Sequence, residues 1–190
     1  RGRKNFSLMA KSKSAYSEPT KLGKLDHHII VVWVDNEAGV LARVVGLFSG
    51  RGYNIDSLAV AEIDKLKHLS RITIVSIGTP EVIEQIKLQL KKLLCVHQVA
   101  DFNRSDSNIL FRELALFKIV SSPKNQEKVK KACKKFNSVI LDKTKKSFVI
   151  QVTALRMEID KLTKDLKPLG LVSISRTGAV AMTRGAKILN

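Results

Sequence analysis

Apolar residues between positions 28 and 52 follow first a strand pattern and then a helix pattern. The run from His28 to Val34 is apolar and rich in β-branched residues, which predicts a buried strand. A polar, turn-like segment, Asp35 to Gly39, follows it. Apolar residues then recur at helical spacing on one face of a helix that two glycines end: Leu41, Val44, Val45 and Phe48, then Gly50 and Gly52.

The same alternation continues to residue 102. Tyr53 to Ile63 and Leu69 to Ile77 predict two further strands. Thr79 is a predicted helix N-cap with Pro80 at the first helical position, and Val96 to Phe102 predicts a fourth strand. Between them runs a buried stripe formed by Ile83, Ile86, Leu90 and Leu94. The order β-α-β-β-α-β is the ferredoxin-like arrangement.

The second half repeats this order after a polar linker at residues 103–108. Glu113 to Val120 alternates as a strand does, and Ser122-Pro123 is a second cap-plus-proline helix start. The remaining predicted elements are a helix with Val129, Ala132, Cys133 and Phe136 on one face, strands at Val139–Leu141 and Ser147–Thr153, a helix through Ile159, Leu162 and Leu166, and a last strand from Leu171 to Met182. The predicted fold class is therefore α+β, with two tandem ferredoxin-like βαββαβ domains.

These patterns divide the chain into three segments. Residues 1–26 are rich in Lys and Ser with little apolar pattern, and we expect a disordered basic lead-in there. The first domain is expected at residues 27–103 and the second at residues 104–190. A short lead-in fits a bacterial cytoplasmic protein, and the plastid stroma is the alternative location.

Composition narrows the function classes. No apolar run approaches 18 residues, so we expect no membrane span. The net charge of +17 suggests nucleic-acid binding, but residues 27–104 carry only +1, and eighteen Lys and Arg against seven acids lie in residues 105–190. That excess fits a solvated face or an acidic partner. Two cysteines are too few for a disulfide framework.

Catalytic chemistry is not evident in the sequence. The four histidines lack the spacing of metal ligands on one element, and Cys95 with His97 supplies only two ligands. Gly46, Gly50 and Gly52 lie at the end of a predicted helix, so they do not form a dinucleotide-binding fingerprint. We therefore predict a binding function with no catalytic residues and no bound metal.

Several short motifs are distributed over both predicted domains. N-E-A-G-V-L-A-R-V at 36–44 continues with G-L-F at 46–48, and R-G-Y-N-I follows at 51–55. Further motifs are L-S-R-I-T-I at 69–74, R-E-L at 112–114, R-T-G at 176–178 and R-G at 184–185. Together they resemble the small regulatory subunits of acetohydroxyacid synthase, also called acetolactate synthase. The resemblance spans about residues 28–190, whereas a generic ACT domain would match only the first part.

The resemblance implies a regulatory role. The first domain would be an ACT domain that forms a homodimer and binds valine between two copies. The chain would activate a large catalytic subunit, which holds thiamine diphosphate, Mg²⁺ and FAD and condenses pyruvate with a second 2-oxo acid; this chain would bind no cofactor itself. The implied valine-binding residues are Asn36, Glu37, Ala38, Gly39, Val40, Leu41, Asn54 and Ile55.

Elementary chemistry of the segment 36–41 agrees with an amino-acid ligand. A helix N-terminus favours a carboxylate, and Gly39 lets the backbone approach a ligand. The amide of Asn54 can bond an ammonium or a carboxylate, while Val40, Leu41 and Ile55 are candidates for an apolar pocket. Asn36 and Gly39 are also common turn and cap residues in any protein, and the family often has Ser where Ala38 stands.

Three alternatives remain at this point. An RNA-binding ferredoxin-like protein is suggested by Arg51-Gly52-Tyr53, which begins like an RNP1 motif, although Asn54-Ile55-Asp56 breaks its aromatic pattern. A stand-alone enzyme would need the catalytic groups that the sequence lacks. An ACT regulator that senses another amino acid would not explain the match in the second half. We expect neither nucleic acid nor membrane among the partners.

Overall fold

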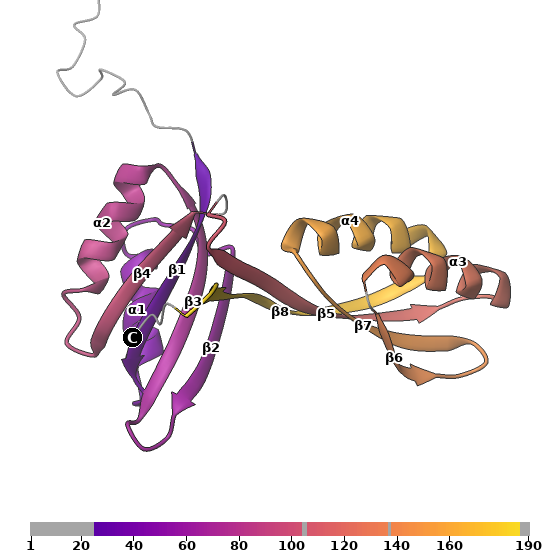
Figure 1. Ribbon diagram of the computed structural model, residues 1–190, viewed down its shortest axis with the longest axis horizontal. Helices are drawn as coiled ribbons and strands as arrows, with labels where there is room; N and C mark the ends of the chain where they lie inside the picture. Colours follow the sequence, from indigo (N-terminus) through magenta and orange to yellow (C-terminus); the bar gives the residue numbers. More distant parts are fainter. Residues whose placement is uncertain (1–24, 104–105, 137, 187–190) are drawn as a thin grey trace, which may run out of the picture.

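The computed structural model describes residues 25–103, 106–136 and 138–186 of the chain. The first half has the order β1 (Asp26–Asp35), α1 (Val40–Ser49), β2 (Ser57–Asp64), β3 (Leu69–Gly78), α2 (Pro80–Leu90) and β4 (Val96–Asn103). Its four strands form an antiparallel sheet in the order β2-β3-β1-β4. Both helices cover the same face of this sheet (Figure 1).

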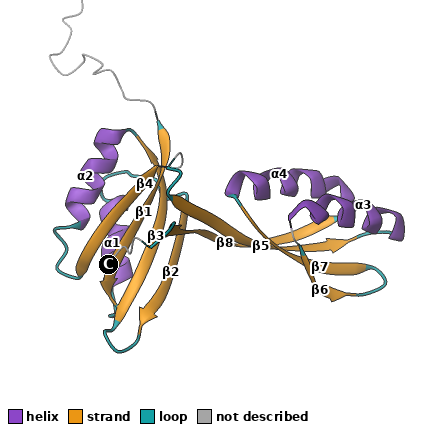
Figure 2. Cartoon of the chain, viewed as in Figure 1, coloured by secondary structure: helices purple, strands orange, loops and turns teal. Residues whose placement is uncertain are grey.

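The second half repeats this architecture. Its elements are β5 (Ile109–Val120), α3 (Pro123–Cys133), η1 (Lys134–Phe136), β6 (Val139–Lys143), β7 (Ser147–Ala154), α4 (Arg156–Leu166), η2 (Lys167–Leu169) and β8 (Leu171–Thr183). The strand order β6-β7-β5-β8 corresponds strand by strand to that of the first sheet. Helices α3 and α4 lie on one face of the second sheet (Figure 2). The predicted α+β class with two ferredoxin-like βαββαβ units is confirmed.

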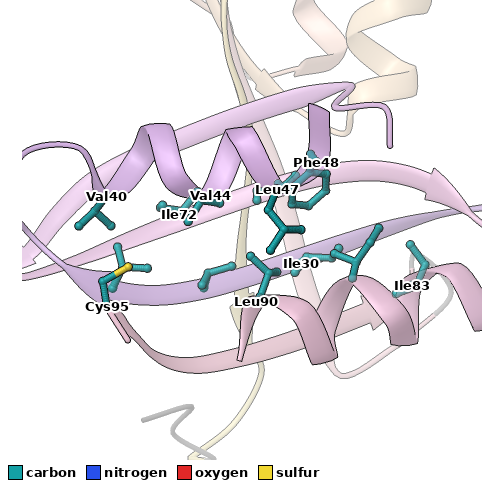
Figure 3. Close-up of a cluster of buried hydrophobic side chains, with 13 residues drawn as sticks. Ile30, Val40, Val44, Leu47, Phe48, Ile72, Ile83, Leu90 and Cys95 are labelled. Atoms are coloured by element: carbon teal, nitrogen blue, oxygen red, sulfur yellow. The ribbon is translucent and has the colours of Figure 1, made fainter. Parts of the chain in front are cut away.

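The core of the first half lies between α1, α2 and the sheet (Figure 3). Helix α1 buries Val40, Val44, Leu47 and Phe48. The predicted face was wrong in two positions, because Leu41 is 41% exposed and Val45 is only half-buried. Val40 opens the helix directly after the turn at Gly39, and the buried positions then follow it at i+4, i+7 and i+8.

Two predicted boundaries were also wrong. β2 begins at Ser57 and not at Tyr53, because residues 53–56 form a loop in which the Tyr53 ring packs edge-on against Phe48 at 6.2 Å between centroids. Helix α2 ends at Leu90, so Leu94 lies in the following turn and is fully exposed. Both errors arose where an apolar residue beyond the end of an element continued its pattern in the sequence.

The other face of the first sheet is covered by a ribbon made of the outer ends of β5 and β8. The ribbon extends from the second half to the first (Figure 1). Its β5 strand begins at Ile109, four residues earlier than the predicted start at Glu113. Apolar residues of both halves form one buried cluster there: Ile29, Val31, Trp33, Val75 and Phe102 from the sheet, and Ile109, Ala179 and Ala181 from the ribbon. The two halves are therefore packed together through an apolar contact.

The domain boundaries 27–103 and 104–190 stay predictions. The buried cluster under the ribbon contains residues from both sides of that division. β1 begins at Asp26, and residues 1–24 of the expected lead-in lie outside the described residues. In the described ranges, no helix is long and apolar enough to cross a membrane.

Candidate functional site

The loop between β1 and α1 exposes the N-terminus of α1. Residues 36–39 are all exposed. Gly39 is the N-cap with φ +84°, a left-handed conformation that glycine adopts without strain. The Val40 N–H donates to the Glu37 carbonyl at 3.3 Å. Because Gly39 has no side chain to cap the helix, the next two first-turn N–H groups, those of Leu41 and Ala42, stay open to an external anion.

Asn36 is held at the corner between β2 and β3. Its side-chain Nδ2 donates to Glu62 Oε1 at 2.9 Å, and its Oδ1 accepts from Ser70 Oγ at 3.0 Å. Its backbone N–H donates to the carbonyl of His68 at 2.6 Å. These bonds fix the direction in which the loop leaves β1, and they leave one proton and one lone pair of the amide for a ligand.

Asn54 and Ile55 lie in the loop after α1. The Asn54 carbonyl accepts from Ser76 Oγ at 2.7 Å, and its Nδ2 donates to Asp56 Oδ1. Ile55 is half-buried and packs against the core of the first half. The side chain of Asn54 is exposed, so this loop also presents a polar group to solvent.

The segments 36–41 and 54–55 lie at opposite ends of α1. The helix has 10 residues, so its ends are roughly 15 Å apart at 1.5 Å per residue. The hydrogen-bond partners of the two asparagines show the same separation. Ser70, which bonds Asn36, lies near the start of β3, and Ser76, which bonds Asn54, lies near its end. Within one copy of the chain, the eight predicted residues therefore form two half-sites that a single amino acid cannot bridge.

The predicted apolar residues divide in the same way. Val40 is 2% exposed and belongs to the core, whereas Leu41 extends outward beside the loop. Ile55 belongs to the other half-site. Of these three, Leu41 is the side chain most available to a ligand at the β1–α1 loop.

Sequence reasoning missed the residues that hold the two asparagines. Glu62, Ser70 and Asp56 bond the side chains of Asn36 and Asn54. Glu62 and Ser70 come within reach of Asn36 only because β2 and β3 form a hairpin in which they are paired. Only Asp56, two residues from Asn54, could have been found from local spacing.

Cysteine and histidine side chains do not gather into a cluster in the described ranges. These ranges contain no group of three or more His, Cys, Asp or Glu residues that could hold a metal ion. Cys95 is buried, while His97 is exposed and its Nε2 lies 2.6 Å from Asp35 Oδ1. Burial raises the pKa of the Cys133 thiol to about 11, so this thiol stays protonated at neutral pH.

The βαββαβ fold and the open, glycine-capped helix start of the first half are typical of an ACT-type domain. Two family models match the chain: the AHAS small subunit-like ACT domain matches residues 30–98, and the small subunit of acetolactate synthase matches residues 112–185. The chain belongs to the acetolactate synthase small-subunit family.

Individual relatives are similar to this chain over most of their length. The acetolactate synthase isozyme 3 small subunit of Salmonella typhimurium is 38% identical over 162 residues, which is 85% of this chain and 98% of the relative. The small subunit of Aquifex aeolicus is 39% identical over 167 residues, 87% of this chain and 85% of the relative. The crystal structure of the Thermotoga maritima small subunit superposes with a TM-score of 0.77 at 31% identity, covering 85% of this chain and 99% of that one.

Proposed function

We propose that this chain is the regulatory subunit of acetolactate synthase, which activates the catalytic subunit and makes it sensitive to valine. Its relatives are named small subunits, a name that implies a larger catalytic partner. In this proposal thiamine diphosphate, Mg²⁺ and FAD belong to the catalytic subunit, and the chain supplies a binding site for the effector. The bacterial relatives support a bacterial cytoplasm over a plastid stroma.

The distance between the two half-sites within one copy supports the proposal of a homodimer. If two copies pair with their α1 helices antiparallel, the segment 36–41 of one copy meets Asn54 and Ile55 of the other. The edge strand β2 is suited to such pairing, because in the described sheet it has one strand neighbour, β3, and it exposes Val60 and Ile63. A twofold axis would then generate two equivalent valine sites.

Each part of valine has a matching group at this proposed interface. The carboxylate would accept from the open N–H groups of Leu41 and Ala42, and the ammonium would bond the Asn54 side-chain oxygen of the other copy. The side chain would lie against Leu41 and Ile55. Valine would inhibit by binding the inhibitory arrangement of the complex better than the active one, with a typical coupling of about 1–3 kcal/mol.

Calorimetry on the purified chain tests the ligand. We expect valine to bind with the highest affinity in a series of valine, leucine, isoleucine and serine. Tighter binding of serine would instead support an ACT regulator of another kind. A companion assay of acetolactate formation, with thiamine diphosphate and Mg²⁺, should give turnover only when the catalytic subunit is present.

Gly39→Asp tests the site. The new carboxylate would lie where the ligand carboxylate binds, and a Cβ added to Gly39 would meet no atom within 4 Å beyond its own chain neighbours. We expect valine inhibition of the reconstituted enzyme to weaken by at least about tenfold, which is a loss of roughly 1.4 kcal/mol, while activation persists. Gly39→Asn is the matched control, since it has the same shape and tolerates a positive φ but adds no charge. Unchanged valine sensitivity in Gly39→Asp would contradict the site.

RNA binding is disfavoured by the same structure. The Arg51-Gly52-Tyr53 segment lies in the loop after α1 and not on a strand. The sheet face that ferredoxin-like RNA binders use is covered here by the ribbon, which buries Trp33 and Phe102. No aromatic platform for base stacking is left on that face in the described residues.

A further inference from the structure

A pocket of about 230 Å³ lies between the two halves of the chain, away from the β1–α1 loop. Apolar side chains from both halves line it: Ile29 and Val75 from the first sheet, Phe111 and Ala179 from the ribbon, and Met157 from α4. Its volume is below the roughly 300–1,000 Å³ of sites for drug-sized ligands, so it fits a small metabolite. Its walls favour an aliphatic group.

The charged lining of this interdomain pocket contains two arginines, Arg112 and Arg156, and one acid, Glu113. His27 also lines the pocket, and its Nε2 lies 3.6 Å from Asp56 Oδ2. The charge of Glu113 is already matched, because Arg176 Nε and Nη2 donate to its two carboxylate oxygens at 2.6 and 2.8 Å. The pocket therefore has an excess of positive charge.

Arg156 contributes a buried donor without a partner to this lining. Its Nη1 is buried and has no hydrogen-bond partner, and within the described part of the chain Arg156 forms no ion pair. Leaving a buried charged donor unpaired costs free energy, which an anionic ligand would recover. Arg156 is also the first residue of α4, so the helix dipole adds to the positive potential.

We propose that this interdomain pocket binds a small branched aliphatic carboxylate, at a site separate from the proposed valine site. The carboxylate accepts from Arg156, as a planar guanidinium is suited to do. The hydrocarbon part packs against Ile29, Val75 and Met157. An amino acid and a 2-oxo acid share this chemistry, so the experiment includes both.

Methyl-resolved NMR on the full chain tests this pocket with four compounds of one carbon skeleton. The probes are 3-methylbutanoate, valine, 2-oxo-3-methylbutanoate and the neutral 3-methylbutanamide, with inorganic phosphate as a general anion. We expect the Met157 and Ile29 methyl signals to shift with at least one of the carboxylates and with neither the amide nor phosphate. The carboxylate that binds most tightly identifies the ligand class.

Four variants complete the test. Arg156→Gln should weaken binding about 10- to 100-fold, while Arg156→Lys retains part of the affinity. Lys161→Gln, the same charge change at an exposed position of α4, should have no effect. Gly39→Asp should leave these shifts in place, which separates this site from the proposed valine site.

Equal shifts with the amide, equal shifts with phosphate, or unchanged affinity in a folded Arg156→Gln chain would each overturn the proposal. The melting temperature of Arg156→Gln shows whether the chain is folded. If that variant is unfolded, Arg156→Lys decides, because full loss of binding with the charge retained would also contradict the proposed role of the cation.

Discussion

Glu113 is a buried carboxylate whose side chain is 4% exposed, and Arg176 on β8 pairs with both of its oxygens. Hydrogen bonding to Glu113 raises the pKa of Arg176 well above its usual value. Arg176 also donates to the exposed Asp160 on α4 at 2.6 Å. At the residue scale, one guanidinium therefore connects β5, β8 and α4.

Removing this guanidinium should destabilise the chain markedly. Arg176→Met keeps most of the side-chain volume but leaves the Glu113 carboxylate buried and unpaired. Breaking a buried pair costs roughly 3–5 kcal/mol, and because Arg176 is 28% exposed we expect about 2–3 kcal/mol. Urea unfolding at fixed chain concentration measures the loss.

Asp160→Asn is the matched control for the same cluster. The Asp160 side chain is 48% exposed, so its pair with Arg176 should contribute less than about 1 kcal/mol. Equal losses in Arg176→Met and Asp160→Asn would show that the buried carboxylate is not the main contribution.

At the element scale, α1 both closes the core and separates the two half-sites. Its buried face is Val40, Val44, Leu47 and Phe48, and its N-terminus remains open at Gly39. The helix is short, so its stability comes mainly from tertiary packing and not from intrinsic propensity. The direction of α1 over the sheet thereby determines where the ligand-facing loops lie.

Two leucines of α1 should respond differently to the same truncation. Leu47 is buried and Leu41 is 41% exposed. We expect Leu47→Ala to lower the free energy of unfolding by about 2–4 kcal/mol and Leu41→Ala by less than about 1 kcal/mol. Thermal or urea unfolding of the two variants distinguishes them. A larger loss of unfolding free energy in Leu41→Ala than in Leu47→Ala would instead support the buried helix face predicted from the sequence, which included Leu41.

At the scale of the whole molecule, the ribbon of β5 and β8 joins the two halves. It covers the first sheet opposite its helices, and Arg71 lies over the Trp33 ring at 5.2 Å from its centroid. Arg71 also donates to the carbonyl of Ala181 on β8. Because the ribbon belongs to the second half, any movement of that half reaches the first sheet directly.

A charge placed under the ribbon should separate it from the first sheet. Ile109 is 6% exposed in the shared cluster, so Ile109→Asp buries a carboxylate there and should cost at least about 2 kcal/mol. Trp33 is the single tryptophan of the chain, and its fluorescence should shift to longer wavelength and become quenchable by acrylamide. Asn108→Asp adds the same charge at the exposed neighbouring position and should leave the emission unchanged. A buried tryptophan signal in Ile109→Asp would contradict this account of the ribbon.

Local sequence patterns determined most elements and the loop chemistry of this protein. β-Branched runs, the Thr79-Pro80 helix start and the repeat of the pattern after residue 108 predicted both βαββαβ units, because strand and helix periodicity are local properties. The turn at Gly39 was also predictable, since a glycine before an apolar helix is a local signal. The predicted ligand role of these residues remains a prediction.

Only the tertiary structure decided which apolar residues are buried and which residues meet. Leu41 and Leu94 continue an apolar pattern in the sequence but have no partner surface in the fold. The ribbon cluster, the Glu113–Arg176 pair and the position of Arg156 all join residues far apart in the chain. Contacts of this kind depend on how strands pair and how the halves pack, and periodicity within one segment carries no information about either.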